Sequence, residues 1–363
     1  MKQFKDTLIQ ILIGAVVGVG AGVLAAILLP GLELGYELLW MAASLLVSFY
    51  LHIILHEGGH LVCGLLSGYK FVSFRIGSQI LIKINGKYHL KKFNIPGTGG
   101  QCLLDPPEMV DGQYPAKLYN LGGGLSNFLF SAAALLISLV SASRILDVVL
   151  FPFILIGIVL GATNLIPLRI GGIANDGYNL KTMDSDPISS KALWQQLRVN
   201  KLQSDGLRLK DMDVELFDLA QSDIEANPLV DQMKLFWMQR MLDERRFDEA
   251  AAFGRKLLQS KTSIELFKYM VNVEMLYLEL IGACREEEVK RRYNKILKKW
   301  LKMVKGYPST HRVNYAYAVR FAKDEKMASK AAAGFAKACK GYPMQGEIET
   351  EKMLFAEVEK EEN

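Results

Sequence analysis

The chain is organised around the stretch Leu51-His52-Ile53-Ile54-Leu55-His56-Glu57-Gly58-Gly59-His60-Leu61, which places a His-Glu-x-x-His pattern inside an apolar run. In a helix, His56 and His60 lie one turn apart on the same face, so both imidazoles can bind one metal ion. Glu57 follows His56 directly and can reach a water molecule beside that metal. Two imidazoles, a carboxylate base and an open coordination position are the parts of a zinc hydrolase. The pattern therefore predicts a zinc site.

The apolar setting adds weight to this pattern. Three of the five histidines of the chain lie in the segment, at positions 52, 56 and 60. Ionisable groups at membrane depth are costly and usually mark a functional site. The competing interpretation is a polar patch that joins helices through hydrogen bonds. For His52, a packing role is favoured over a supporting role beside the metal, and both stay open.

Composition divides the chain into two parts. Half of the 363 residues are hydrophobic, and they are concentrated before Arg169, whereas charged residues recur every few positions from Asp184 onward. We expect a transmembrane domain over residues 1–183 and a soluble, cytoplasmic α-helical domain over residues 184–363. The net charge of +5 is modest and concentrated beside apolar runs, which favours membrane topology over nucleic-acid binding. The four cysteines show no Cys-x-x-Cys spacing, so neither a disulfide framework nor a thiolate zinc site is indicated.

Four apolar runs are long enough to cross a bilayer. They cover Thr7–Leu29, Leu38–Leu66, Leu118–Ser141 and Val148–Leu168. The connection between the second and third runs is rich in lysine, so the positive-inside rule places it, and both termini, in the cytoplasm. We therefore expect an integral protein of a bacterial cell membrane, with His56 and His60 near the cytoplasmic end of their helix.

Residues 71–93 change to an alternating pattern. Apolar residues alternate over 71–76, 80–84 and 87–93, and Asn85-Gly86 separates the last two segments. Asn-Gly between alternating runs is a strong signal for a two-residue hairpin. The pattern predicts a small antiparallel sheet at the membrane surface, with His89 exposed. Its edge could pair with an extended substrate or the sheet could be a structural cap, and both interpretations stay open. Residues 96–101 and 105–107 are rich in turn formers and predict loops.

A third metal ligand is needed to complete the site. Asp176 lies on a glycine-bounded loop after the fourth run, at the depth inferred for His60, and is the best-placed carboxylate. Asp184 and Asp186 compete with it, but they are typical of the cap of a helix that begins near Pro187. The sequence Gly122-Gly123-Gly124-Leu125-Ser126-Asn127 lets another backbone approach closely and supplies a buried amide.

Over residues 38–178 the chain resembles the site-2 protease family of intramembrane zinc metalloproteases. The matching segments, in the family's order, are His56-Glu57-Gly58-Gly59-His60, Gly122 to Asn127, Asn164-Leu165-Ile166-Pro167 and Asp176-Gly177. The resemblance implies His56, His60 and Asp176 as zinc ligands, Glu57 as general base and Asn164 as a stabiliser of the oxyanion. The spacing between Pro167 and Asp176 is longer than in the commonest family pattern, and no inserted PDZ-like domain is evident.

The second half is rich in helical patterns from Pro187 to the end. Segments 235–242 and 247–258 resemble a tetratricopeptide-like helix-turn-helix. Two similar strings, Lys305-Gly306-Tyr307-Pro308 and Lys340-Gly341-Tyr342-Pro343, are 35 residues apart, close to the period of such repeats. An irregular helical bundle is the alternative. A basic run over residues 290–305 reads as one helix with a solvated face, or with a face for anionic lipid.

These patterns together predict an all-α polytopic membrane protein with a small hairpin and a tetratricopeptide-like soluble domain. We expect a zinc endopeptidase that hydrolyses peptide bonds of membrane-embedded proteins or peptides. Its expected partners are Zn²⁺, the lipid bilayer, such a substrate and a protein bound at the helical domain, with no nucleic acid. The alternative is a catalytically silent membrane scaffold that binds partners through that domain. A transporter is disfavoured because four runs without duplicated halves do not match transporter architecture.

Overall fold

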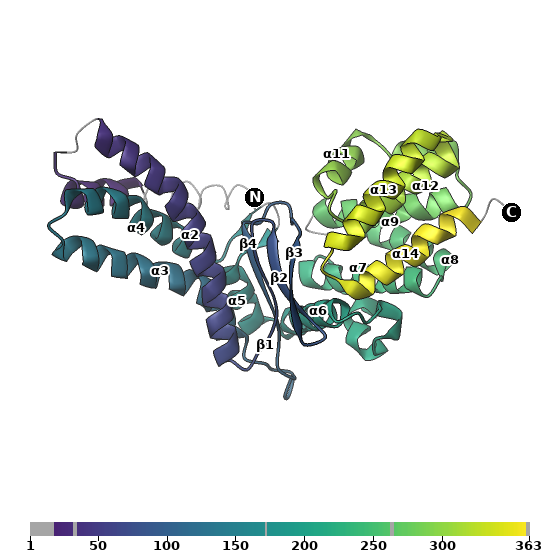
Figure 1. Ribbon diagram of the computed structural model, residues 1–363. Helices are drawn as coiled ribbons and strands as arrows, with labels where there is room; N and C mark the ends of the chain where they lie inside the picture. The colour runs from purple at the N-terminus through teal and green to yellow at the C-terminus, as the bar shows by residue number, and fades with distance from the viewer. Residues whose placement is uncertain (1–17, 32–34, 171–172, 262–264, 361–363) are drawn as a thin grey trace. The chain divides into compact units, whose positions relative to one another are not determined.

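The computed structural model describes residues 18–31, 35–170, 173–261 and 265–360 (Figure 1). The described chain is mostly helical and forms two compact units. The first unit contains the residues up to Lys70 and the segment Tyr114–Ser185, and the second contains Phe71–Gln113 and the residues from Asp186 onward. The expected division after residue 183 lies next to the boundary between Ser185 and Asp186. Residues 71–113, expected in the transmembrane domain, instead make their contacts within the second unit.

The first unit is built on three long helices, α2 (Tyr36–Leu66), α3 (Ala116–Val140) and α4 (Arg144–Leu165). Among the described residues, these three are long and apolar enough to cross a membrane. They correspond to three of the four expected runs. The other run, Thr7–Leu29, lies partly outside the described residues, and its described part is the shorter apolar helix Gly18–Leu28.

Glycines let these helices pack closely, because a helix without side chains at the contact can approach another backbone. A Cβ atom added to Gly59 of α2 would lie 2.2 Å from the carbonyl oxygen of Gly122 on α3, and the reciprocal distance is 2.4 Å. A Cβ on Gly124 would lie 2.4 Å from Leu165 of α4. Two of the three consecutive glycines therefore face two different helices, as the close approach predicted from the sequence requires.

The first unit is completed by a short connection after α4. It contains the two-residue strands β5 (Arg169–Ile170) and β6 (Ile173–Ala174), which pair antiparallel, and the helix α5 (Asp176–Ser185). A Cβ added to Gly177 would lie 2.1 Å from the carbonyl oxygen of Leu165. The first turn of α5 is thus pressed against the end of α4.

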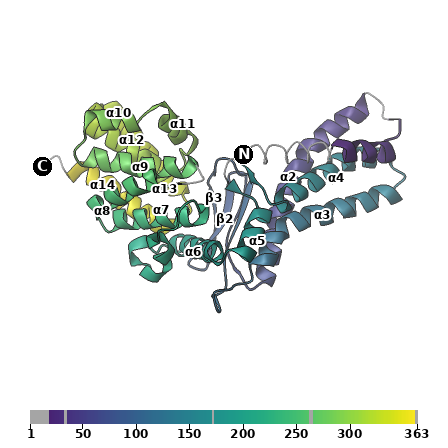
Figure 2. The same ribbon diagram turned by 180° about the vertical axis from the view of Figure 1, so that it is seen from behind.

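A four-stranded sheet in the order β3-β2-β1-β4 opens the second unit; Figure 1 labels its four strands, and Figure 2 shows the sheet from behind. Its strands are β1 (Lys70–Ile76), β2 (Gln79–Ile84), β3 (Lys87–Lys92) and β4 (Gly100–Asp105). Ile84 pairs with Lys87 across a two-residue turn, in which Asn85 and Gly86 have φ values of 48° and 80°. Positive φ at both positions matches the primed turn that Asn-Gly favours, so the predicted hairpin is confirmed. His89 is exposed, as expected. The loops predicted at residues 96–101 and 105–107 are confirmed for 96–99 and 106–107, whereas the residues from Gly100 to Asp105 form β4, which was not predicted.

Helices make up the rest of the second unit around one large apolar core. The α-helices are α6 (Pro187–Ser204), α7 (Pro228–Asp243), α8 (Phe247–Gln259), α9 (Glu265–Ile281), α10 (Glu286–Arg292), α11 (Lys295–Met303), α12 (Pro308–Ala316), α13 (Glu325–Gly341) and α14 (Gln345–Lys360). Two 3-10 helices, η1 (Leu209–Asp211) and η2 (Val214–Gln221), and a π-helical segment, η3 (Tyr317–Ala322), lie between them. The predicted helix-turn-helix is present as α7 and α8, whereas a tetratricopeptide repeat stays a prediction.

Local sequence signals account for several helix ends. Asp186 caps α6 by accepting a hydrogen bond from the Ile188 amide at 3.0 Å, which confirms its expected role. Asn294 accepts from the amides of Ile296 and Leu297, both at 3.0 Å, and so begins α11. The basic run expected as one helix is therefore two helices, α10 and α11, because this cap starts a new one.

The sheet is held to the helices of its own unit by polar and aromatic contacts. Arg198 of α6 donates to both carboxylate oxygens of Asp105 at 3.0 and 3.1 Å. The ring of Phe93 lies 5.1 Å from each of the Tyr307 and Tyr342 rings. These two tyrosines come from the two similar strings, which lie at the junctions before α12 and α14. The strings thus place equivalent side chains on the sheet.

Candidate metal centre

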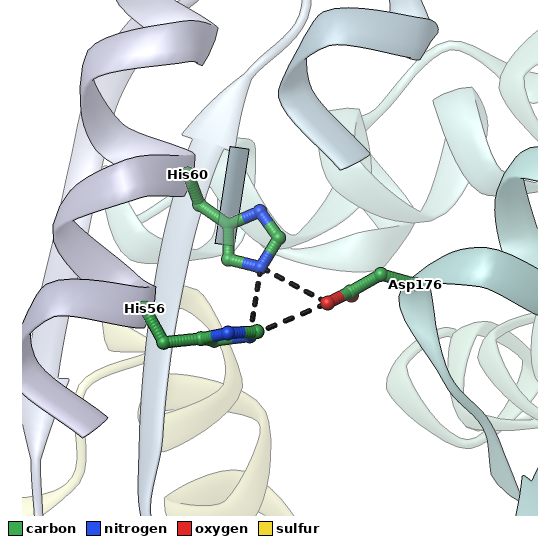
Figure 3. Close-up of side chains that lie close together, drawn as sticks. All are labelled: His56, His60 and Asp176. Carbon is green, nitrogen blue, oxygen red and sulfur yellow. Dashed lines mark hydrogen bonds and ion pairs between the residues drawn. The ribbon is translucent and has the colours of Figure 1, made fainter. Parts of the chain in front are cut away.

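Three side chains of the first unit converge on one point (Figure 3). His56 and His60 project from α2, and Asp176 is the first residue of α5. The two Nε2 atoms are 3.2 Å apart, and the Oδ2 atom of Asp176 lies 3.3 Å from each of them. The exposed fractions of the three side chains are only 14 %, 9 % and 21 %. The structure therefore brings together the three ligands expected from the sequence.

The spacing of these atoms fits a tetrahedral zinc ion. Zinc binds imidazole nitrogen and carboxylate oxygen at about 2.0–2.1 Å, so two ligand atoms at a tetrahedral angle lie about 3.3 Å apart. The observed separations of 3.2 and 3.3 Å agree with that value. Asp176 Oδ2 is buried and makes no hydrogen bond within the described chain, which suits an atom whose partner is a cation. Three protein ligands leave one tetrahedral position for water or substrate.

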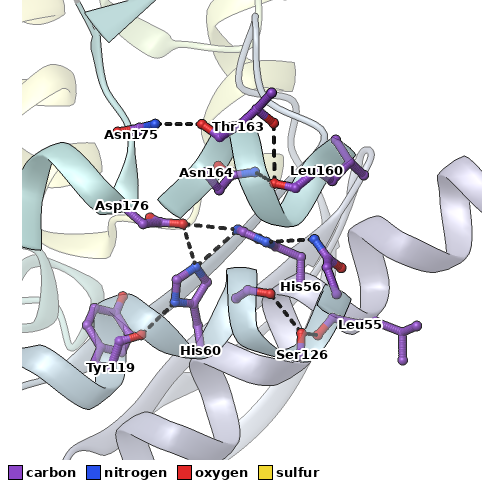
Figure 4. A network of polar contacts seen from close by, with 12 residues as sticks. Leu55, His56, His60, Tyr119, Ser126, Leu160, Thr163, Asn164, Asn175 and Asp176 are labelled. Atoms are coloured by element: carbon purple, nitrogen blue, oxygen red, sulfur yellow. Dashed lines mark hydrogen bonds and ion pairs between the residues drawn. The ribbon is translucent and has the colours of Figure 1, made fainter. Parts of the chain in front are cut away.

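The remaining ring nitrogens of both histidines are oriented by hydrogen bonds. His60 Nδ1 donates to the carbonyl oxygen of Tyr119 at 2.7 Å, because a carbonyl can only accept. The proton is then on Nδ1, and the lone pair of Nε2 points toward His56 and Asp176. A second hydrogen bond of this kind commonly fixes the ring of a metal-binding histidine. Figure 4 shows this contact beside the others around the site.

Asn127 of α3 links His56 to a second, fully buried histidine. One end of its amide group lies 3.2 Å from Nδ1 of His52 and the other lies 3.2 Å from Nδ1 of His56. His52 Nε2 lies 2.8 Å from the carbonyl oxygen of Phe153 and must donate to it. In the structure, Asn127 Oδ1 faces His52 and Nδ2 faces His56. A neutral His52 that donates from Nε2 accepts at Nδ1, which requires the Asn127 amide to be rotated by 180° so that its nitrogen faces His52 and its oxygen faces His56. This arrangement places a proton on His56 Nδ1 and leaves its Nε2 free for a metal.

His52 therefore supports the site from one turn away. Its exposed fraction is 0 %, and its ring packs at 4.2 Å from that of Phe153 on α4. The packing role favoured from the sequence is present, and the hydrogen bond to Asn127 adds the supporting role. Asn127 was noticed in the sequence as a buried amide. The chain of contacts from His52 to His56 could not be inferred from spacing alone.

Asp176 is positioned by its neighbour Asn175, which sequence reasoning missed. The Asn175 amide nitrogen donates to the carbonyl oxygens of Thr163 and Ile166, both at 2.6 Å. Its amide oxygen accepts from the backbone N–H groups of Leu168 at 3.1 Å and Tyr178 at 2.8 Å. One side chain thus closes the end of α4 and caps α5, and Figure 4 shows its contact with Thr163. An Asn just before a helix is a recognisable N-cap signal, and it could have pointed to this residue.

Burial and the imidazoles act in opposite directions on Asp176. Burial alone raises the pKa of its carboxyl group, but the close contacts and charge interaction with His56 and His60 at 3.3 Å outweigh burial and hold the pKa well below its usual range. The carboxylate is therefore ionised at neutral pH. An ionised carboxylate and two neutral imidazoles are the forms that bind zinc.

Space for an ion between these ligands depends on Gly123. A Cβ atom at this position would lie 2.4 Å from Nε2 of His60 and 2.6 Å from Nε2 of His56. Any side chain there would enter the volume where the three ligand atoms meet. The middle glycine of the three therefore faces the metal site, whereas its neighbours face helices.

The two expected catalytic residues, Glu57 and Asn164, lie on α2 and α4. Glu57 lies on α2 between the two histidines and is 9 % exposed, so it is buried beside the site. The Asn164 amide donates to the carbonyl oxygen of Leu160, one turn earlier in α4, at 2.9 Å. Its side chain therefore has a hydrogen bond within its own helix and retains a second amide proton.

Comparisons with known proteins add no identification. No family model, no curated protein and no solved structure matches this chain. The conclusions about function therefore depend on the geometry of the site.

Proposed function

We propose that the chain is an intramembrane zinc endopeptidase. The observation that carries the proposal is the triangle formed by His56 Nε2, His60 Nε2 and Asp176 Oδ2, with sides of 3.2, 3.3 and 3.3 Å. Two corners of the triangle lie on α2, which is apolar enough to cross a membrane. The third corner lies on the short helix α5, which follows α4, another helix of that kind. A metal site of this ligand type at that depth is typical of hydrolysis rather than of structural zinc, because one position stays open.

The residues supply the parts of a peptide hydrolysis. Zinc, when bound, acts as a Lewis acid on a carbonyl oxygen and on water. Glu57 accepts a proton from the attacking water and returns it to the leaving amine. The second amide proton of Asn164 is available for the oxyanion that develops on the substrate. Asn127, His52 and Tyr119 hold the imidazoles in the required tautomer.

The substrate that we propose is a membrane-embedded protein or peptide. Helices α2, α3 and α4 carry many exposed apolar side chains that suit lipid contact. The connection between α2 and α3 contains six lysine and arginine residues, at positions 70, 75, 83, 87, 91 and 92, and Lys117 lies in the first turn of α3. By the positive-inside rule this end of the helices faces the cytoplasm. Cleavage would then release the cytoplasmic part of a substrate.

The test is a Glu57→Gln variant in cells that carry a transmembrane reporter. We expect the purified variant to keep about one zinc per chain and to lose cleavage, because the amide cannot accept a proton from water. Removal of a general base costs at least about 10²-fold in rate. Glu287→Gln, at an exposed position of α10, is the matched control and should cleave normally. Cleavage by Glu57→Gln at the rate of the control would refute the assignment.

The same experiment addresses the silent scaffold. If purified wild-type protein binds no zinc, and wild type and Glu57→Gln have the same membrane proteome, the scaffold is the better description. The helical unit would then be the part that acts, through a bound protein partner.

A further inference from the structure

A cavity of about 410 Å³ lies within the second unit. It is bounded by one face of the sheet, by α6, α7 and α9, and by the junctions before α12 and α14. Its size falls within the range of small-ligand sites. All of its lining residues belong to the second unit, so the cavity is separate from the metal centre.

Amide side chains form one wall of this cavity. Gln196, Asn200 and Gln203 follow each other on one face of α6, and Gln232 and Gln239 lie seven residues apart on one face of α7. Gln203 is 2 % exposed. Within the described chain, the side chains of Gln203, Gln232 and Gln239 make no hydrogen bond. Each amide can donate and accept, so the wall offers both kinds of group in close succession, as a peptide backbone requires.

The second wall is aromatic and apolar. Tyr307 and Tyr342 line it, with ring centroids 5.6 Å apart, and both contact Phe93 of the sheet region. Trp300 of α11 and Met270 of α9 extend the same surface. This wall suits apolar side chains of a ligand. The two similar Gly-Tyr-Pro strings thus have a common role, because each places one tyrosine in the cavity.

The ionisable side chains that line the cavity are acidic, Glu274 and Glu347. Among the described residues that line it, none is lysine, arginine or histidine, although the chain carries a net charge of +5. Glu274 is neutralised by Arg312 at 2.7 Å. Glu347 accepts a hydrogen bond from the Tyr342 hydroxyl at 2.8 Å and has no ion pair within the described chain. Burial, with a smaller contribution from the charge of Glu351, raises the pKa of Glu347 to about 8. A cationic group of a ligand would compensate this carboxyl group.

We propose that the cavity binds a short apolar peptide with a free amino terminus. The ammonium group lies at Glu347, the peptide backbone bonds to the free amides of Gln203, Gln232 and Gln239, and the side chains pack against Trp300 and the two tyrosines. The site is a sensor or receptor pocket and needs no peptidase activity at the metal centre.

The test uses the full chain in lipid nanodiscs and equilibrium dialysis against all tripeptide amides built from Ala, Leu and Phe. A second mixture carries the same sequences with an acetylated amino end. Mass spectrometry identifies the peptides that are retained. We expect wild type to retain members of the free mixture and to bind the acetylated forms at least about tenfold more weakly, the usual effect of losing a hydrogen-bonded charge.

Two variants and a control assign the binding to this cavity. Glu347→Gln and the double change Gln232→Ala with Gln239→Ala should each reduce retention about tenfold or more. Gln259→Ala, at an exposed position of α8, should retain peptides as wild type does. Zinc content and far-ultraviolet circular dichroism confirm that each variant is folded. Equal retention of the acetylated mixture, or no retention of either mixture by folded wild type, would overturn the proposal.

Discussion

Gly123 is the residue at which the metal site is most sensitive to a single methyl group. In Gly123→Ala the new Cβ would lie within 2.6 Å of the Nε2 atoms of both histidines. We expect zinc content to fall from about one per chain to near zero and cleavage to fall at least about 10²-fold, because misplacement by about 1 Å has that effect. Metal analysis and the reporter assay measure this.

Gly58→Ala is the matched control for Gly123→Ala. Gly58 lies inside the His-Glu-x-x-His pattern itself, but a Cβ added there meets no other atom within 4 Å. It should keep both zinc and activity. If Gly58→Ala and Gly123→Ala lose zinc alike, the site is not where the three ligands meet.

Arg312 holds two buried carboxylates in the core of the second unit. Its exposed fraction is 0 %, and it bonds Glu274 and Glu351 at 2.7 Å each. Arg312→Met would leave both acids buried without a cation, which costs about 3–5 kcal/mol of the free energy of unfolding. Thermal unfolding of the full chain should show the loss as a lower Tm. Arg255→Met, at an exposed position of α8, should leave Tm within about 1 °C, since surface changes are usually small. Equal Tm values for the two variants would contradict the prediction.

Titration of Glu347 makes the free energy of unfolding fall as the pH rises. Its folded-state pKa is about 8, against an ordinary value of 4.5, so between these pH values the folded chain binds more protons than the unfolded chain. Stability therefore falls as pH rises from about 4.5 to 8. Glu347→Gln removes this contribution, so its Tm relative to wild type should rise steadily from pH 5 to pH 8.5. A Tm difference that is constant over this range would show that Glu347 titrates normally.

At the scale of elements, the junction between α4 and α5 determines whether Asp176 reaches the histidines. Asn175 uses all four of its hydrogen-bonding positions there, two as donor and two as acceptor. The change Asn175→Asp removes the two hydrogen-bond donors, and Asn175→Ala removes the donors and the acceptor oxygen. We expect zinc affinity to fall about 10–100-fold in both, the usual effect of removing a residue that orients a ligand.

Competition with a zinc chelator measures this change in affinity. Asn179→Ala, one turn later in α5, is the control and should retain the affinity of wild type. Unchanged affinity in Asn175→Ala would mean that the loop holds Asp176 without this side chain.

Elements with strong local signals could be predicted from the sequence. Asn85-Gly86 encodes its own turn through positive φ, and Asp186 before Pro187 encodes a helix start. The strand Gly100–Asp105 was missed, because its turn-like start and the prolines that follow it suggested a loop. Its formation depends on pairing with β1, which is distant in sequence. The basic run forms two helices because Asn294 caps the start of the second one. A run of like charges does not determine where a helix begins.

At the scale of the whole molecule, the metal ligands were predictable and their supports were not. His56, His60 and Asp176 stand out because few residue types bind zinc and each lies at a helix end or face. The contacts of Asn127 and Asn175 join segments that only tertiary packing brings together. The division into units was also hidden, since residues 71–113 lie between two apolar runs in sequence but pack with helices that begin at Pro187.

This interleaved order of segments has a consequence for synthesis. The chain passes between the two units three times, after Lys70, Gln113 and Ser185. A ribosome therefore completes the metal centre before it has made any helix that covers the sheet. Until Tyr307 and Tyr342 emerge, Ile80, Ile82 and Phe93 lack the two tyrosine rings that pack with them in the folded unit, so this apolar cluster is completed only after α12 and α13 have been made.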